Sequence, residues 1–188
     1  MRSKVFNVPN TLSLIRVFLA PLVLLFLSLK IDEKFISFLP DVSWGDVLAA
    51  IVFIIASITD AFDGYIARRD HIVTDLGKFI DPLADKVLVI AAMLALIELN
   101  RLPAWIVMVI ITREFVVTGL RLVAAAQGVV IAASKGGKLK TVCQIFALIM
   151  LILNIPGGMA LMWVAMILTV WSGMEYLIKG SKIITGSN

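Results

Sequence analysis

One stretch of the sequence indicates the fold class of the whole chain: residues 44–69 have the sequence WGDVLAAIVFIIASITDAFDGYIARR. A helix needs about 20 apolar residues to cross a lipid bilayer, and Trp44–Ile66 supplies a segment of that length. The segment carries Asp60 and Asp63 near its end, just before a pair of arginines. Acidic side chains at membrane depth cost about 3 kcal/mol each, so they survive where they face the interior of a helix bundle and meet a partner. The stretch therefore predicts a membrane helix that ends in a functional carboxylate site.

The composition of the chain is that of a membrane protein. The 188 residues are 61% hydrophobic and 16% charged, with a mean hydropathy of +1.03, whereas soluble domains average about 25% charged residues. A soluble fold of this size could not bury so much apolar surface, and a disordered chain would be far more polar. The single cysteine, Cys143, excludes an internal disulfide framework and any multi-cysteine metal site.

Six segments of the chain are apolar enough to be read as membrane spans. They are Thr11–Leu29, Trp44–Ile66, Phe79–Leu99, Pro103–Gln127, Lys140–Leu153 with its flanking residues, and Met159–Ile178. Helix-breaking stretches separate them: a polar segment at 32–41, a short turn at 100–103, and the sequence NIPGG at 154–158. We therefore expect an all-α membrane protein with six transmembrane helices, folded as a single integral membrane domain over residues 1–188.

The distribution of Lys and Arg predicts the orientation of these spans, because cytoplasmic loops carry an excess of both residues. Six spans put both ends of the chain on one side. That side would hold Arg2, Lys4, Arg68, Arg69, Lys78, Lys135, Lys138, Lys140, Lys179 and Lys182, and the other side Lys30, Lys34 and Arg101. Both termini are therefore predicted to be cytoplasmic. The net charge of +4 is expected to meet membrane lipid headgroups rather than nucleic acid, since the basic residues form no continuous stripe.

A second pair of carboxylates opens the third predicted span, in the stretch GKFIDPLADK at 77–86. Asp60 and Asp63 are three residues apart and Asp81 and Asp85 are four apart, so each pair shares one face of its helix. The connection between the two spans is short, which predicts antiparallel neighbours whose acidic ends meet near the cytoplasmic surface.

Carboxylates gathered in a partly desolvated site repel one another unless cations lie between them. Because oxygen ligands favour hard ions, we expect two Mg²⁺ ions, with Mn²⁺ as a substitute. The alternative is that the aspartates form ion pairs with nearby Arg and Lys residues.

The combined pattern is D-x-x-D-G-x-x-A-R at 60–68, then eight residues, then G-x-x-x-D-x-x-x-D at 77–85. It resembles the signature of the CDP-alcohol phosphotransferase family at every defined position. The resemblance implies the six-helix membrane fold of that family, a homodimer, and an enzyme in which an alcohol displaces CMP from a CDP-linked lipid. The segment NVPNTLSLIR at 7–16 is similar to the amino-terminal segment of the same family. Asn10 and Thr11 in this segment are also residue types that cap a helix.

The resemblance also implies roles for individual residues. Asp60, Asp63, Asp81 and Asp85 would bind the two metal ions, and Asp85 would act as the general base that removes the proton from the acceptor hydroxyl. The residues that would contact the CDP-lipid are Asn10, Thr11, Asp60, Gly64, Ala67, Arg68, Thr74 and Gly77.

Basic residues in and beside the fourth and fifth predicted spans indicate the chemistry of the acceptor. Arg113 and Arg121 are eight residues apart in one apolar helix, so they point roughly the same way, and arginines in such a helix require an anionic partner. Adjacent residues such as Arg113 and Glu114 do not face each other on a helix. Lys138 and Lys140 add positive charge before the fifth span. We therefore predict a phosphate-bearing acceptor held by Arg113, Arg121, Lys138 and Lys140. Headgroup contact is the alternative for these side chains.

Three further stretches narrow the acceptor by resemblance: ITREFVVTGLR at 111–121, GKLKT at 137–141 and WSGMEY at 171–176. They resemble bacterial members of the family whose acceptor is sn-glycerol 3-phosphate. This likeness implies transfer of the phosphatidyl group of CDP-diacylglycerol to glycerol 3-phosphate, at a cytoplasmic active site of the bacterial cell membrane. A same-family enzyme with another acceptor, such as a cardiolipin synthase or an inositol-phosphate transferase, stays open. A divalent-cation transporter is the remote alternative. Transporter sites usually lie near the bilayer midplane, whereas these aspartates are predicted at the cytoplasmic ends of their helices.

Overall fold

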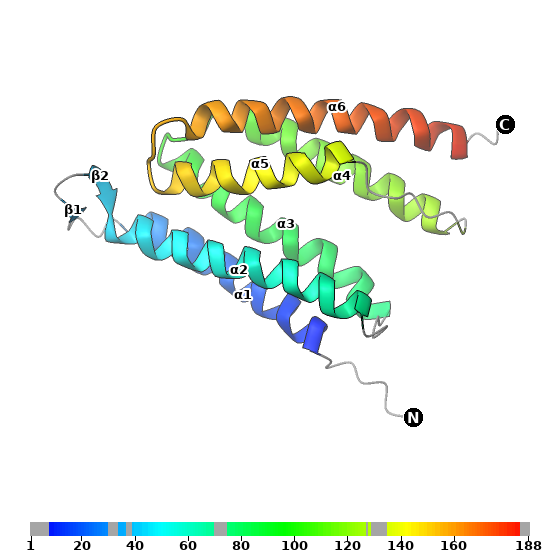
Figure 1. Cartoon of the computed structure of the whole chain (residues 1–188), viewed down its shortest axis with the longest axis horizontal. Helices are drawn as coiled ribbons and strands as arrows, with labels where there is room; N and C mark the ends of the chain where they lie inside the picture. The colour runs from blue at the N-terminus through cyan, green and yellow to red at the C-terminus, as the bar shows by residue number, and fades with distance from the viewer. Residues whose placement is uncertain are drawn as a thin grey trace. The chain divides into compact units, whose positions relative to one another are not determined.

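The computed structural model describes the backbone of residues 8–29, 34–36, 39–69, 75–126, 128 and 135–184, and the side chains of residues 14–29, 42–59, 84, 86–125, 128 and 136–178. Six helices make up most of this described part of the chain (Figure 1). They are α1 (Val8–Ser28), α2 (Trp44–Arg69), α3 (Asp75–Glu98), α4 (Ala104–Ala126), α5 (Lys135–Ile152) and α6 (Gly158–Ile184). Each predicted span corresponds to one of them, so the prediction of six helices is confirmed.

The connection between α1 and α2 contains a short hairpin that the sequence analysis did not predict. Two short strands, β1 (Lys34–Ile36) and β2 (Leu39–Ser43), pair antiparallel there, with Lys34 opposite Ser43 and Ile36 opposite Leu39. Strands this short leave no alternating pattern that a sequence reading can detect. Pro40 is tolerated in β2 because a two-stranded ribbon consists of edge strands.

The start of α1 differs from the expected capping. The helix begins at Val8, so Asn10 and Thr11 lie inside it and neither is the residue that caps it. Pro9 fits the first turn of a helix, because the N–H that proline lacks has no helical partner there. The interpretation of Asn10 or Thr11 as an N-cap is therefore wrong.

The chain forms two compact units, of which the first contains residues 1–101 and 151–155. Within this unit α1 packs along both α2 and α3, and Figure 1 shows that α2 and α3 run in opposite directions. The end of α2 and the start of α3 therefore lie at the same end of the unit, as the sequence predicts. Small side chains let these helices approach closely. The buried alanines of the unit are Ala20, Ala49, Ala50, Ala56, Ala84, Ala91, Ala92 and Ala95.

Ser43, Asp46 and Arg101 fix the opposite end of the first unit. The Ser43 hydroxyl accepts a hydrogen bond from the Asp46 N–H at 3.1 Å, and the Asp46 carboxylate accepts one from the Ser43 N–H at 2.9 Å. This reciprocal pair is a capping box for α2. Arg101 donates to both Asp46 oxygens, at 2.7 and 3.1 Å, and to the carbonyl of Ile152 at 2.7 Å. Arg101 thus ties the start of α2 to the last residue of α5.

The turns predicted at 100–103 and 154–158 are both present. Asn100 has φ 56° and Asn154 has φ 49°, in the left-handed region that asparagine tolerates better than most residues. The N–H of Arg101 donates to the carbonyl of Leu96 at 2.9 Å, which satisfies one of the last carbonyl groups of α3. Gly157, with φ 95°, supplies the turn before α6.

The second unit contains residues 102–150 and 156–188, and α4 packs against α6 within it. The rings of Trp105 and Trp163 meet edge to face, with centroids 5.2 Å apart, a favourable geometry for aromatic pairs. Ile106, Ile110 and Met162 of this unit are fully buried. The part of α6 that begins at Thr169 therefore lies against the middle of α4, at Arg113.

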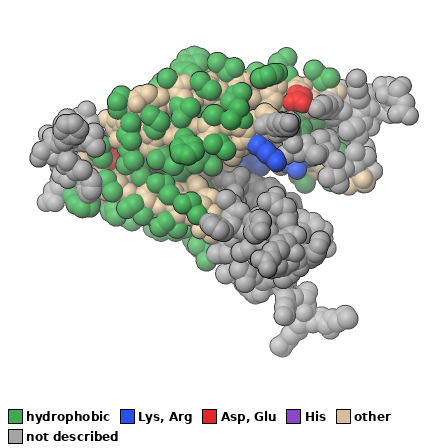
Figure 2. Space-filling model, in the orientation of Figure 1, with side chains coloured by type: hydrophobic (Ala, Val, Ile, Leu, Met, Phe, Trp, Pro, Cys, Tyr) green, Lys and Arg blue, Asp and Glu red, His purple; other side chains and the backbone are tan. Residues whose placement is uncertain are grey.

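The surface of the described residues is largely apolar. Figure 2 shows hydrophobic side chains over much of the described surface that it displays, and Phe18 and Trp171 are 74% and 70% exposed. Exposed apolar surface of this extent marks contact with a membrane or another apolar partner. Among the described residues, one helical stretch, Gly158–Ile178, is long and apolar enough to cross a membrane, and Leu14–Ser28 and Trp44–Thr59 are shorter apolar helical segments.

Candidate functional site

The four aspartates of the predicted metal site lie on continuous helix. Asp60 and Asp63 belong to α2, which continues to Arg69, and Asp81 and Asp85 belong to α3, which begins at Asp75. The prediction that each pair shares a helix at the required spacing is confirmed by the backbone. The side chains of these aspartates lie outside the described residues. Among the side chains that are described, no three potential metal ligands lie together.

The predicted CDP-lipid contacts whose backbone is described belong to three helices of the first unit, α1, α2 and α3. Asn10 and Thr11 are in the first turn of α1, Gly64, Ala67 and Arg68 are near the end of α2, and Gly77 is in the first turn of α3. Their side chains, and the whole of Thr74, lie outside the described residues. These assignments therefore stay predictions.

Arg16 is a buried charge that the sequence reading did not assign to the site. Its side chain is 1% exposed in α1, the helix that packs on both aspartate-bearing helices. A buried charge is costly unless it is paired and hydrogen-bonded. The feature of the sequence that could have identified Arg16 is its position as a single arginine inside an apolar span. Arg16 thus brings positive charge into the interior of the unit that carries the aspartates.

Arg113 of α4 lies against α6. Its Nε donates to the carbonyl of Thr169 at 3.1 Å and its Nη2 donates to the hydroxyl of Ser172 at 2.8 Å. The guanidinium also lies 5.7 Å from the centre of the Tyr176 ring, within the range of a cation–π interaction. Most of the partners of Arg113 are therefore neutral groups of the protein, whereas the sequence reading expected an anionic partner.

Glu114 is the one anionic partner of Arg113 among the described residues. The Arg113 Nη1 donates to Glu114 Oε1 at 3.3 Å, so the expectation that these two neighbours do not face each other is wrong. That rule describes the directions of Cβ atoms, and both side chains are long enough to bend toward each other. The same Glu114 oxygen accepts from the ammonium of Lys140, which is buried in α5.

Arg121 and Lys138 differ from Arg113 and Lys140 in their surroundings. Both are exposed, whereas Lys140 is buried and the Arg113 side chain is 11% exposed. Arg121 sits in the last two turns of α4. The structure thus joins Arg113 and Lys140 through Glu114, and no described contact joins Arg121 or Lys138 to this group.

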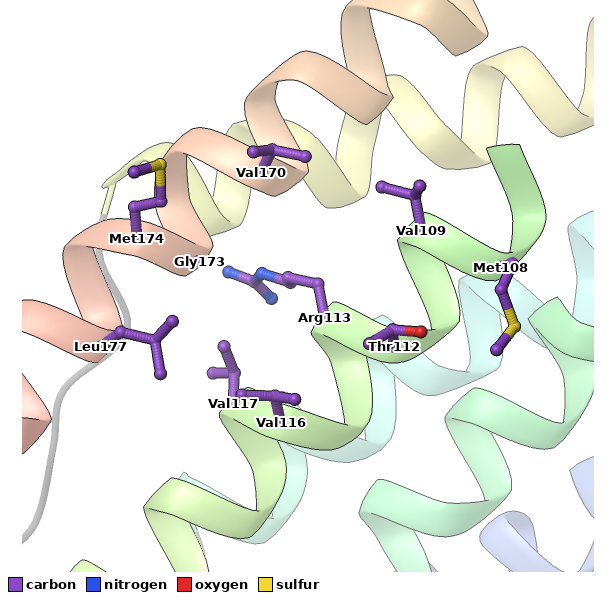
Figure 3. Close-up of a pocket in the computed structure, with 10 residues that line it drawn as sticks. All are labelled: Met108, Val109, Thr112, Arg113, Val116, Val117, Val170, Gly173, Met174 and Leu177. Atoms are coloured by element: carbon purple, nitrogen blue, oxygen red, sulfur yellow. The ribbon is translucent and has the colours of Figure 1, made fainter. Parts of the chain in front are cut away.

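A cavity of about 380 Å³ lies between α4 and α6 (Figure 3). Arg113 is the one charged residue among those that line it. The remaining lining residues are Met108, Val109, Thr112, Val116, Val117, Val170, Gly173, Met174 and Leu177. Walls of this composition suit an apolar group, and the bonds of Arg113 to α6 hold its guanidinium against the helix. The cavity is therefore not assigned to the phosphate of an acceptor.

Four residues of α6 that contact Arg113 were missed as site residues. Thr169 and Ser172 accept its hydrogen bonds, Tyr176 faces its guanidinium, and Gly173 leaves room for its side chain. These positions follow the spacing i, i+3, i+4, i+7 of a single helix face. A face of hydroxyl and small residues within an apolar span was the signal that could have identified them.

The residues matched by family comparison cover most of the chain. A sequence model of the family described as CDP-alcohol phosphatidyltransferase matches residues 6–171, and the chain belongs to this family. The family is membrane-associated and generally uses divalent metal ions. The predicted resemblance is therefore confirmed.

Several relatives are similar over nearly their whole length. The CDP-diacylglycerol–glycerol-3-phosphate 3-phosphatidyltransferase of Bacillus subtilis (strain 168) is 44% identical over 97% of this chain and 100% of its own. The enzyme of the same name from Escherichia coli (strain K12) is 39% identical over 92% of this chain and 93% of its own. A probable phosphatidylglycerophosphate synthase of Mycobacterium tuberculosis (strain ATCC 25618 / H37Rv) is 37% identical over 98% of this chain and 87% of its own.

Proposed function

We propose that this chain transfers the phosphatidyl group of CDP-diacylglycerol to sn-glycerol 3-phosphate, giving phosphatidylglycerophosphate and CMP. The observation that carries the proposal is 44% identity over 97% of the chain to a relative named for this reaction. The family match over residues 6–171 supports the reaction class independently. The basic residues on α4 and α5 support an acceptor that carries a phosphate, because a neutral alcohol would not require them.

The proposed metal ligands are Asp60, Asp63, Asp81 and Asp85. Their donor atoms are all carboxylate oxygens, which suit Mg²⁺ first and Mn²⁺ second. Their spacing on α2 and α3 supports two converging pairs. Two divalent ions bound there would neutralise the diphosphate and the charge that develops on the leaving oxygen. The four aspartates therefore fit the metals that the family uses.

Asp85 is the proposed general base. It accepts the proton of the acceptor's hydroxyl while the oxygen of that hydroxyl forms a bond to the phosphatidyl phosphorus. The bond from this phosphorus to the bridging oxygen breaks, and the electron pair leaves with CMP. A positioned carboxylate contributes about 10²–10⁴-fold to such a step.

The remaining substrate contacts follow from the same family likeness. Gly64 and Ala67 leave space beside Asp60 for the CDP group, and Arg68 and Thr74 donate hydrogen bonds to its phosphates. The CDP-lipid set is completed by Asn10, Thr11 and Gly77. On the acceptor side, Arg113, Arg121, Lys138 and Lys140 supply the positive charge that a glycerol phosphate requires.

The proposal includes a membrane arrangement. We infer that all six helices cross the membrane of a bacterial cell as one domain, with both termini and the active site in the cytoplasm, and that the chain forms a homodimer. The lengths of the six helices and the apolar surface support the crossings. The excess of Lys and Arg at one set of helix ends supports the orientation.

One assay tests the proposal. Purified protein in detergent–lipid micelles is given CDP-diacylglycerol, Mg²⁺ and radiolabelled glycerol 3-phosphate, and we expect label in the lipid fraction with an equal release of CMP. Phosphatidylglycerol and inositol phosphate are supplied as alternative acceptors in parallel reactions. Incorporation of another acceptor in place of glycerol 3-phosphate would reassign the substrate within the family, and the absence of CMP release with every acceptor would contradict the reaction class.

A further inference from the structure

The carboxylate of Glu114 joins two cations from different helices. Its Oε1 accepts from Arg113 Nη1 at 3.3 Å on α4 and from the Lys140 ammonium on α5. The Lys140 side chain is 6% exposed and the Glu114 side chain is 25% exposed. Lys140 is therefore a buried cation that faces a more accessible carboxylate.

The other side of this arrangement is anchored on α6. Arg113 is held there by Thr169, Ser172 and the Tyr176 ring. Because Arg113 is fixed, the carboxylate that it contacts is fixed as well. The contacts thus run in series from α6 to Arg113, from Arg113 to Glu114, and from Glu114 to Lys140.

The charges of the three side chains explain why a carboxylate is needed between the cations. Two cations placed side by side repel each other, and burial increases that repulsion because it lowers the local dielectric constant. Glu114 offsets it and leaves the group with one net positive charge. A group of this charge still attracts an anion, while the carboxylate itself would repel one.

We propose that Glu114 is a positioning residue for the phosphate of the acceptor: it holds the Lys140 ammonium, backed by Arg113, in the place where the phosphate binds. This inference rests on the proposed function. Arg121 and Lys138 are exposed, so their long side chains lose rotamer freedom when they bind a ligand. The group of Arg113, Glu114 and Lys140 is already ordered, and its part in binding costs less entropy.

The first test replaces Glu114 by Gln, which keeps the size of the side chain and removes its charge. We expect E114Q to raise the KM for glycerol 3-phosphate about tenfold, with kcat and the KM for CDP-diacylglycerol changed less than about twofold. E98Q is the matched control, because Glu98 accepts a hydrogen bond from Ser28 at 3.4 Å in the other unit of the chain. This control is expected to leave both KM values unchanged.

A double-mutant cycle with K140M separates positioning from a general structural effect. If Glu114 acts through Lys140, E114Q adds little to the KM for glycerol 3-phosphate once the ammonium is gone. Equal effects of E114Q in the two backgrounds would overturn the inference. A lowered KM in E114Q would also overturn it, since the carboxylate would then be a competitor of the phosphate.

A second variant and the result for the wild-type protein keep the inference testable. Should E114Q fail to accumulate in the membrane, S172A removes one anchor of Arg113 without changing any charge and is expected to raise the same KM about threefold; an unchanged KM in S172A would overturn the inference. A wild-type protein that does not use glycerol 3-phosphate refutes the proposed function and this inference with it. A wild-type protein that uses it beside an unaffected E114Q refutes only the role of Glu114.

Discussion

The side chain of Arg113 lies along Gly173, so closely that a Cβ atom added to Gly173 would be 2.8 Å from Arg113 Cγ and 3.3 Å from its Nε. Real Cβ atoms do not approach other atoms to 2.8 Å, so a larger residue at this position must displace the arginine. The displacement would act on the whole series of contacts from α6 to Lys140. Gly173 is therefore required by the neighbouring side chain rather than by the backbone of α6.

G173A is expected to raise the KM for glycerol 3-phosphate about fivefold, because it pushes Arg113 away from Thr169 and Ser172. The KM for CDP-diacylglycerol is expected to stay within about twofold of the wild-type value. G119A is the matched control, since nothing lies within 4 Å of a Cβ added at that position of α4. Identical kinetics in the two variants would show that the packing of Arg113 does not affect the acceptor.

G45A is expected to lower the stability of the protein by about 1–3 kcal/mol. A Cβ at this position would lie 2.5 Å from the carbonyl oxygen of Phe26 and 2.9 Å from that of Leu29. Both obstacles are backbone atoms, which cannot turn aside as a side chain does. Thermal unfolding in detergent, followed by circular dichroism, measures the change. A melting temperature equal to that of G119A would contradict the close approach of α1 and α2.

The sequence predicts the helices of this fold well because their main determinant is local. A run of apolar residues sets the length of each helix, and Asn and Gly residues set the turns at 100–103 and 154–158. The hairpin of β1 and β2 was not predicted, since its strands of three and five residues contain too few positions for a periodic pattern. Short elements of this kind depend on pairing with one another, which a linear pattern does not record.

The candidate site also contains some features that the local sequence reveals and others that depend on how the helices pack. The helical placement of the four aspartates on α2 and α3 could be predicted because their spacing within each helix is visible in the sequence, and their role as metal ligands stays a prediction. The contacts of Arg113 with Thr169 and Ser172 join residues more than fifty positions apart, and they depend on how α4 packs against α6. The contact of Arg113 with Glu114 was missed for a different reason: the rule for adjacent helical residues treats side chains as short and straight.

D46N is expected to destabilise the protein by about 3 kcal/mol while the KM for glycerol 3-phosphate stays unchanged. Asp46 receives two hydrogen bonds from Arg101 and forms the capping box with Ser43, and its side chain is 4% exposed. Asparagine keeps the shape but leaves the guanidinium without its opposite charge. The thermal unfolding assay used for G45A measures the loss. A variant as stable as the wild type would mean that the cap and its ion pair contribute little to the fold.

D85N is expected to reduce the rate of glycerol 3-phosphate incorporation by about 10²–10⁴-fold, because a carboxamide cannot accept the proton of the acceptor hydroxyl. Binding of radiolabelled CDP-diacylglycerol, measured on the detergent-solubilised protein, is expected to stay within about threefold of the wild type, since the other aspartates remain. D75N, at the first residue of the same helix, is the matched control and should retain full activity.

Removal of divalent ions with EDTA should abolish wild-type incorporation, and added Mg²⁺ should restore it. Added Mg²⁺ should not restore D85N, because the missing group is a base and not only a ligand. Recovery of D85N at high Mg²⁺ would show instead that Asp85 serves the metal alone and that another group takes the proton.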